Sequence, residues 1–327
     1  MLKFLLRRFA NYLVLIVLAT CLGYFLAATA LHPRSVYQGR NPPPPEASID
    51  KTLDDLNLND KTPVVTRFKT WATHALHGDF GKTVYGQPIG NEMKRRMGVS
   101  LRLLLLGSLL GALFGVALGV ISAVKQYQFT DHFGTTLSFI VLSTPVFLLA
   151  VLLKVGAFNV NQHSGYPVLY YVGEATPGLG GSLSATLVDR LKHLALPTLA
   201  ITLPQIAFYS RYQRNAFLDV LGSDFLRTAQ AKGLRRRTAL IKHGLRTALI
   251  PMATFFAYSF GLLLTGAAFT ETIFAWHGMG EWFVSSVRSN DVNVVAAVTV
   301  FSAILVLMAG LLADLAYAAL DPRVRIR

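Results

Sequence analysis

Apolar and polar segments alternate along the chain on the length scale of a lipid bilayer. Six stretches are almost free of charged residues: 9–31, 99–124, 134–158, 193–209, 248–270 and 292–320. A helix of about 20 apolar residues crosses the hydrocarbon core of a membrane. The pattern therefore predicts an all-α integral membrane protein with six transmembrane helices. The polar segment 32–98, between the first two helices, predicts a small extracytoplasmic cap.

The composition agrees with this pattern. Hydrophobic residues make up 53% of the 327 residues and charged residues 15%, against about 25% charged residues in soluble domains. These proportions argue against a soluble enzyme, a disordered chain and a nucleic-acid-binding protein. Cys21 is the single cysteine, so the chain cannot form an internal disulfide or a cysteine metal cage.

The net charge of +14 is distributed unevenly between the polar segments. With a cytoplasmic N-terminus, the inner segments 1–8, 125–133, 211–247 and 321–327 carry +3, 0, +7 and +2. Basic residues collect on the cytoplasmic side of membrane proteins, so we expect both termini to be cytoplasmic. The cluster Lys94-Arg95-Arg96 disagrees, because it falls outside. We expect residues 89–97 to form an amphipathic helix on the outer membrane surface.

The expected organisation has four parts. Residues 1–31 hold the cytoplasmic N-terminus and the first helix, and 32–98 form the cap, with a short helix expected at 68–76. Residues 99–320 form the transmembrane core with a cytoplasmic loop at 211–250, and 321–327 form a cytoplasmic tail. Ala28-Thr29-Ala30 resembles a signal-peptide cleavage site, but the apolar run 9–31 exceeds the roughly 7–15 residues of a signal peptide. We therefore expect the first helix to be retained.

The second stretch carries a glycine at every fourth position: Gly107, Gly111, Gly115 and Gly119. Four residues advance a helix by about one turn, so these glycines predict a smooth stripe where another helix approaches closely. The alternative is a gating role, because a smooth face can also slide. Prolines predict bends in two other stretches, Pro145 in the third and Pro197 and Pro204 in the fourth.

The loop at 211–250 contains the most informative sequence, DFLRTAQAKGL followed by three arginines, Arg235-Arg236-Arg237. Periodicity predicts a helix before Gly233, with one face formed by Phe217, Leu221, Phe225 and Thr228. Gly233 is placed to end this helix in the left-handed conformation. Thr238 can cap a second helix that continues through His243 and Arg246 to Pro251. The small residues permit close approach by another protein; the alternative is a basic loop resting on anionic lipid.

This loop resembles the EAA loop of ABC importer permeases. "DFLRTAQAKGL…HGLRTALIP" resembles the B-type permease of the oligopeptide/dipeptide group, and the resemblance extends over nearly the whole chain. It includes "RRFANYLVLI", "GDFGKTVYGQPIGNEMKRRMGVSLRL", "STPVF", "ETIFAWHGMG" and "DLAYAALDPRVR". The chain departs from the family pattern at four positions: Gly244, Thr247, His277 and Gly310.

The resemblance implies a transport subunit rather than an enzyme. In such permeases the loop docks into a separate cytoplasmic ATPase, which binds ATP and Mg²⁺. The residues implied in this coupling are Asp224, Phe225, Arg227, Thr228, Ala229, Ala231, Lys232, Gly233 and Leu234. Further implied partners are a homologous C-type permease in a heterodimer, an extracytoplasmic peptide-binding protein docking on 32–98 and 273–291, and the lipid of a bacterial cell membrane. The implied cargo is peptide, with nickel, haem or glutathione as alternatives.

Other kinds of site are poorly supported. Gly81-Lys82-Thr83 ends like a Walker A motif, but Leu76 stands where its first glycine is needed. His74 and His77 are accompanied by no Cys or other close His, so we expect no metal. No G-x-S-x-G motif or nucleophile–base arrangement is found, so we also expect no catalytic residue and no cofactor in this chain. A self-contained ion-coupled transporter is disfavoured, because the charged residues of the spans, Arg102, Lys154, Glu271 and Asp314, all lie near span ends. For Glu271 and Asp291, capping and pairing are favoured over lining an exit path.

Overall fold

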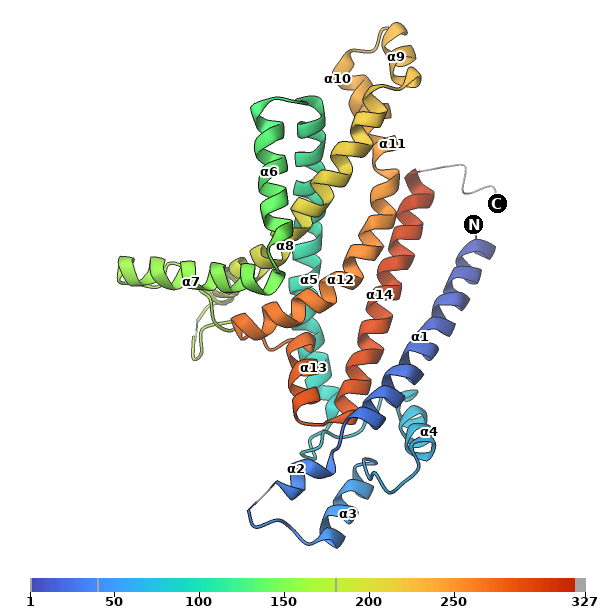
Figure 1. Ribbon diagram of the computed structural model, residues 1–327, viewed down its shortest axis with the longest axis vertical. Coiled ribbons are helices and arrows are strands. Elements are labelled where there is room, and N and C mark those ends of the chain that lie inside the picture. Colours follow the sequence, from blue (N-terminus) through green and yellow to red (C-terminus); the bar gives the residue numbers. More distant parts are fainter. Residues whose placement is uncertain (1, 40, 180, 321–327) are drawn as a thin grey trace. The chain divides into compact units, whose positions relative to one another are not determined.

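The computed structural model describes residues 2–39, 41–179 and 181–320, and the predicted tail at 321–327 lies outside them. Nearly all of the described chain is helical, and its only pairing of extended backbone is an isolated bridge between Lys82 and Pro88. The chain forms two compact units, and Figure 1 shows their helices. Unit 1 comprises Met1–Ser100 and His277–Leu307, and unit 2 comprises Leu101–Trp276 and Met308–Arg327.

Unit 1 is built from short helices around the ends of three long ones. Its complete helices are α1 (Leu2–Ala30), α2 (Arg34–Gln38), α3 (Glu46–Asp55), α4 (Val64–Ala75) and α13 (Met279–Arg288). It also contains the first turns of α5 (Ile89–Val124) and most of α14 (Val292–Leu320). Tyr24, Leu53, Trp71, Val84 and Val292 belong to its buried core. The short helix expected at 68–76 is confirmed as part of α4, whereas residues 89–97 are not a separate surface helix but the beginning of α5.

Unit 2 contains the remaining helices around the rest of α5. They are α6 (Phe129–Ser143), α7 (Val146–Ser164), α8 (Leu183–Leu221), α9 (Asp224–Ala231), α10 (Arg236–Ala239), η1 (Leu240–Leu245), α11 (Arg246–Ala248) and α12 (Ile250–Phe274). The structure breaks the third apolar stretch, expected to be one helix over 134–158, into α6 and α7. The break lies at Thr144 and Pro145, because the residue before a proline is pushed out of the helical conformation; Thr144 is extended, with ψ 122°.

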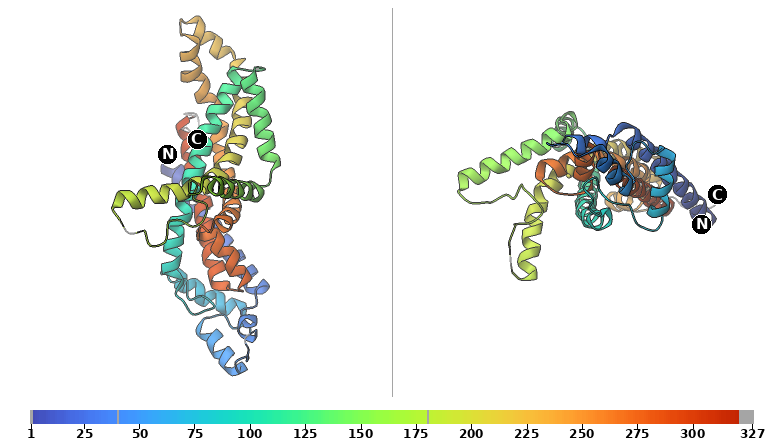
Figure 2. Two further views of the ribbon diagram at one scale, coloured as in Figure 1. Left: turned by 90° about the vertical axis from the view of Figure 1, so that its left-hand side faces the viewer. Right: turned by 90° about the horizontal axis from the view of Figure 1, so that it is seen from below.

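The longest described helix, α8, contains the two prolines that were expected to bend it, and it remains continuous through them. Figure 2 shows that its first turns run in a different direction from the rest of the helix. Pro197 and Pro204 lie in its interior, where each lacks the N–H that would bond to the preceding turn.

Four helical segments of the described chain are long and apolar enough to cross a membrane: Arg7–Gln38, Ile89–Val124, Val146–Ser164 and Val292–Tyr317. Among the described residues, α8 does not meet that combined criterion. The chain is thus a multi-pass, nearly all-helical protein, while the count of six spans stays a prediction.

Candidate functional site

The connection between α8 and α12, residues 222–249, is termed the basic hairpin. It begins with a break that the periodicity did not predict: α8 ends at Leu221, and α9 starts at Asp224 after Gly222 and Ser223. The Ser223 hydroxyl donates to the carbonyl of Val220 at 2.6 Å, which closes the last turn of α8. The expected single helix before Gly233 is therefore two helices, because Ser223 bonds to the backbone in place of a continued helix.

The first half of the hairpin ends at Gly233, as the sequence indicated. Gly233 has φ +88°, a left-handed conformation that glycine adopts without a steric penalty. Its N–H donates to the carbonyl of Gln230 at 2.9 Å, and the N–H of Leu234 reaches back to Ala229 at 3.3 Å. These bonds occupy carbonyl groups that the end of α9 leaves open.

The returning half is a chain of short helices with a π-helical segment, η1, in its middle. Thr238 was expected to cap it, but Thr238 lies inside α10, and the residue preceding that helix is Arg235. At Gly244 the returning segment approaches α8 closely, since an added Cβ would lie 3.2 Å from a methyl carbon of Val220.

An apolar cluster joins the base of the hairpin to α8. Its buried members are Ala123, Phe217, Val220, Leu226, Ala239, Leu240 and Ala248. Leu226, with 2% of its surface exposed, is the buried residue of α9. The first half of the hairpin is therefore anchored to the rest of unit 2 mainly through one leucine.

Most residues implied in ATPase coupling lie on the outside of this hairpin. Ala229 and Leu234 are half-buried, and the exposed ones are Asp224, Phe225, Arg227, Thr228, Ala231, Lys232 and Gly233. Phe225 and Ile241 leave 43% and 69% of their surface open. Figure 1 shows α9 and α10 projecting beyond the ends of α5 and α6.

Charge on the hairpin is mostly positive and mostly exposed. Arg227 and Asp224 are 3.8 Å apart with both side chains largely exposed, and such surface pairs contribute little to stability. The arginines at 235–237 and Lys232 are also exposed. The hairpin therefore presents exposed apolar side chains together with exposed basic ones, which suits a partner surface that is apolar and acidic.

The glycine stripe lies against α8, the helix that leads into the hairpin. An added Cβ would lie 2.7 Å from Ile201 at Gly107, 2.6 Å from Tyr209 at Gly115, and 2.6 Å from the Ser210 carbonyl oxygen at Gly119; at Gly111 it would overlap Gln205. Any side chain at these positions would force the two helices apart.

An ion pair between the half-buried Arg214 and the buried Asp131, which the sequence did not reveal, joins α6 to α8. Arg214 donates from Nε and Nη2 to the two carboxylate oxygens of Asp131, at 2.7 and 2.8 Å. The N–H of Tyr127 adds a third bond to Asp131 at 3.0 Å. Such bidentate pairs fix geometry as well as charge, so the last turns of α8 are held before the hairpin begins.

Comparison with known proteins decides the family. Residues 115–326 match the family model described as binding-protein-dependent transport system inner membrane component. The chain belongs to this family of ABC importer permeases. The permease is 54% identical to the oligopeptide transport system permease protein OppB of Mycobacterium tuberculosis, over 100% of both chains. It is 34% identical to AppB of Bacillus subtilis, another oligopeptide transport system permease protein, over 85% of each chain.

A more distant relative supports the same placement, and a solved structure shares the fold. The permease is 30% identical to the dipeptide transport system permease protein DppB of Escherichia coli, over 99% of both chains. The MetNI methionine ABC transporter, solved in inward-facing conformations, has a chain with a TM-score of 0.53 and 17% identity, covering 70% of this chain and 96% of that one. This likeness shows the fold. The resemblance to the oligopeptide/dipeptide group is thereby confirmed, and the permease is a transport component rather than an enzyme.

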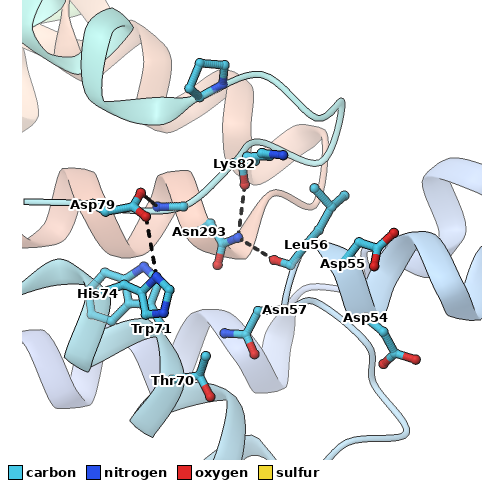
Figure 3. Close-up of a pocket in the computed structure, with 12 residues that line it drawn as sticks. Asp54, Asp55, Leu56, Asn57, Thr70, Trp71, His74, Asp79, Lys82 and Asn293 are labelled. Carbon is cyan, nitrogen blue, oxygen red and sulfur yellow. Dashed lines mark hydrogen bonds and ion pairs between the residues drawn. The ribbon is translucent and has the colours of Figure 1, made fainter.

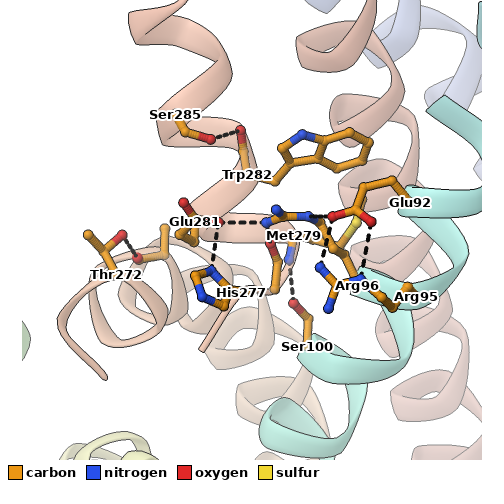
Figure 4. Close-up of polar contacts among 12 residues, drawn as sticks. Glu92, Arg95, Arg96, Ser100, Thr272, His277, Met279, Glu281, Trp282 and Ser285 are labelled. Atoms are coloured by element: carbon orange, nitrogen blue, oxygen red, sulfur yellow. Dashed lines mark hydrogen bonds and ion pairs between the residues drawn. The ribbon is translucent and has the colours of Figure 1, made fainter. Parts of the chain in front are cut away.

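The unexpected basic cluster of the permease, Lys94-Arg95-Arg96, is largely explained by ion pairs within unit 1 (Figure 4). Arg96 bonds to Glu281 of α13 at 2.5 Å and to Glu92 at 2.5 Å, and its guanidinium lies 5.3 Å from the Trp282 ring centre. Arg95 pairs with Glu92 at 2.8 Å. Two of the three cations thus form ion pairs, with Glu92 in the same turns of α5 and with Glu281 of α13.

Glu271 and Asp291, for which the sequence favoured capping and pairing, are both buried in the permease. Asp291 precedes α14 and accepts the N–H of Val294 at 3.2 Å and that of Val84 at 2.7 Å. Burial raises the pKa of Asp291 to about 6, against the opposing effect of these hydrogen bonds. Glu271 is fully buried in the last turns of α12. Asp291 therefore caps a helix and fixes the loop at Val84.

Metal-ligating and nucleotide-binding features remain unconvincing in the described part of the permease. No three His, Cys, Asp or Glu side chains gather there as a metal site would require. His74 instead lies 3.4 Å from Asp79 as a single pair. Gly81-Lys82-Thr83 occupies a loop and the isolated bridge after α4, not the start of a helix, so it lacks the strand–loop–helix context of a phosphate-binding loop.

Proposed function

We propose that this chain is the B-type permease subunit of an ATP-driven peptide importer in a bacterial cell membrane. It forms half of the translocation pathway, and a homologous C-type permease forms the other half. Peptide cargo is supported by relatives that are named as oligopeptide and dipeptide transport permeases. An extracytoplasmic peptide-binding protein delivers the cargo to the cap at 32–98 and the loop at 273–291.

The basic hairpin is the coupling element of this importer, and its geometry is the observation that carries the proposal. Phe225 and Ile241 enter the groove of a cytoplasmic ATPase, and the surrounding lysines and arginines pair with acidic residues at its border. ATP and Mg²⁺ are bound by that ATPase. Because α9 is held by Leu226 in the cluster at the end of α8, movement of the ATPase is passed to α8.

The proposed topology has six spans with the hairpin and both termini in the cytoplasm. The charge distribution supports it, because the segments on that side carry almost all of the net positive charge. The smooth glycine stripe holds α5 against α8 inside this core.

Gly233→Pro tests the coupling role. Proline fixes φ near −65° and removes the N–H, whereas Gly233 needs φ +88° and donates to Gln230 at 2.9 Å. Gly78→Pro is the matched control, since Gly78 has φ +83° and donates to Ala75 at 2.9 Å, but lies after α4. We expect Gly233→Pro to insert normally and to lose both ATPase co-purification and peptide uptake, while Gly78→Pro keeps ATPase co-purification. Co-purification and uptake preserved in Gly233→Pro would refute the coupling assignment.

Cysteine labelling tests the topology. In a Cys21→Ala background, we expect Lys232→Cys to react with a membrane-impermeant maleimide only in inverted vesicles. Asp55→Cys, in the proposed cap, should react only from the outside of intact cells. Both residues are exposed, so poor access does not complicate the readout. Labelling of both positions from the same side would contradict the proposed orientation.

A further inference from the structure

A pocket of about 370 Å³ lies within unit 1, between α3, α4 and the first turn of α14 (Figure 3). The residues that line it include Asp54, Asp55, Asn57, Trp71, His74, Asp79, Lys82 and Asn293. A water molecule occupies about 30 Å³ of liquid, so the pocket has room for an amino-acid residue rather than one solvent molecule. No residue of the basic hairpin lines this pocket.

The base of the pocket holds a hydrogen-bond acceptor that nothing in the described chain satisfies. Asn293 is 1% exposed, and its side-chain Nδ2 donates to the carbonyls of Leu56 and Lys82, both at 3.0 Å. These two bonds fix which way the amide points. Its Oδ1 is buried without a partner among the described residues, and Figure 3 shows this oxygen directed away from both carbonyls.

A second unsatisfied group of the opposite kind lines the same pocket. Trp71 is 4% exposed, and its indole N–H has no acceptor among the described residues. A buried donor and a buried acceptor each lose free energy when left unpaired. One ligand that carries both an N–H donor and a carbonyl acceptor would satisfy the two groups together.

The charge of the pocket identifies which kind of donor fits. Three carboxylates, Asp54, Asp55 and Asp79, line the pocket with one lysine, Lys82, and His74 lies 3.4 Å from Asp79. The N–H of Gly81 bonds to Asp79 at 2.9 Å and is the main cause that lowers the pKa of this carboxyl, so Asp79 stays ionised. An anionic wall beside a neutral acceptor suits a cationic ammonium. It suits a bare metal ion poorly, because the indole N–H cannot coordinate one.

We propose that this pocket binds the amino-terminal residue of a peptide. The α-ammonium donates to Asn293 Oδ1 and lies beside the carboxylates, and the first carbonyl oxygen accepts from the Trp71 N–H. Peptide side chains are not read, since the paired groups meet only the backbone end of the ligand. The inference rests on the proposed function, because it assigns a contact for the cargo of that importer.

Binding to the full-length chain in lipid nanodiscs, measured by isothermal titration calorimetry, tests the site. Trialanine and N-acetyl-trialanine are the probes, since acetylation removes the ammonium and keeps the peptide bonds. We expect trialanine to bind at least roughly tenfold more tightly than its acetylated form. Asp55→Asn should weaken trialanine binding by roughly fivefold or more. Glu46→Gln, which removes another exposed acidic charge of α3 outside the pocket, should leave it unchanged.

A second variant addresses the base of the pocket. Trp71→Phe keeps an aromatic ring in the core of unit 1 but removes the N–H, so it should weaken trialanine and leave binding of a simple amine, ethylamine, unchanged. The proposal would be overturned if trialanine and N-acetyl-trialanine bound equally tightly. It would also be overturned if trialanine bound Asp55→Asn as tightly as it binds the unchanged chain. Ethylamine binding as tightly as trialanine would also overturn it, because the carbonyl contact would then be absent.

The two proposals fail in distinguishable ways. A chain that co-purifies with an ATPase and supports peptide uptake, yet shows no ammonium-dependent binding of trialanine, refutes the pocket alone. A chain without an ATPase partner and without uptake refutes the proposed function, whatever the calorimetry shows.

Discussion

Replacing Gly119 with alanine places one methyl group against backbone that cannot rotate aside. A Cβ there would lie 2.6 Å from the carbonyl oxygen of Ser210 and 3.0 Å from the backbone nitrogen of Arg214. Restoring a contact of about 3.4 Å requires α5 and α8 to separate by about 0.8 Å. Overpacking of this kind costs about 1–3 kcal/mol, and the higher helix propensity of alanine returns about 1 kcal/mol. We expect a net loss of up to about 2 kcal/mol.

Thermal unfolding of the purified permease in detergent measures this loss. One kcal/mol corresponds to about 2–4 °C of Tm in chains of 150–250 residues, so Gly119→Ala should melt several degrees below the unchanged protein. Gly156→Ala is the matched control, because Gly156 lies in the interior of α7 and an added Cβ meets nothing within 4 Å. It should keep or raise the Tm. A Gly119→Ala protein that melts at or above Gly156→Ala would refute the close packing of α5 on α8.

Three further substitutions probe other parts of the fold. Arg214→Ala should lower the free energy of unfolding by about 3 kcal/mol, because it leaves the buried Asp131 carboxylate without its partner. Arg227→Ala removes a cation of an exposed pair and should leave the Tm unchanged within error. Equal losses in the two variants would contradict the role of the Asp131–Arg214 pair. Asp291→Asn should flatten the pH dependence of stability. The folded carboxyl has a pKa of about 6 and the unfolded one 3.8, so the native state loses up to about 3 kcal/mol of stability as pH rises from about 4 to 6. An unchanged pH profile in the variant would disprove the assignment. Leu226→Ala should increase hydrogen exchange in α9 while leaving exchange in α7 unchanged, because it removes the buried anchor of α9; unchanged exchange in α9 would show that other contacts hold it.

Features that repeat with the period of a helix were predictable from the sequence. The apolar stretches predicted the long helices, because a membrane span needs only length and composition. Gly233 was predictable because few residues tolerate a positive φ at the end of a helix, and the structure gives it φ +88°. Family membership followed from local motifs, which survive in a single sequence without any knowledge of the fold.

Contacts between residues far apart in sequence were not predictable in this way. The pairs Asp131–Arg214 and Arg96–Glu281 join positions separated by 83 and 185 residues, and no local period marks them. Short-range competition caused the other errors. Thr144 leaves the helical conformation because a proline follows, and at the end of α8 a serine hydroxyl bonds to the backbone where periodicity alone continues the helix.

The contacts of α8 bear on the two interpretations of the glycine stripe. The residues of α8 pack so closely over the four glycines that an added Cβ would overlap them. Sliding of α8 along α5 would move these α8 side chains from the glycines onto the larger residues between them. It would also break the bidentate Asp131–Arg214 pair, which adjoins Gly119 through the backbone of Arg214. Packed interfaces respond to force by moving as bodies between discrete arrangements. These constraints favour packing over sliding, so force applied to the hairpin would displace α8 together with the part of α5 and α6 that holds it.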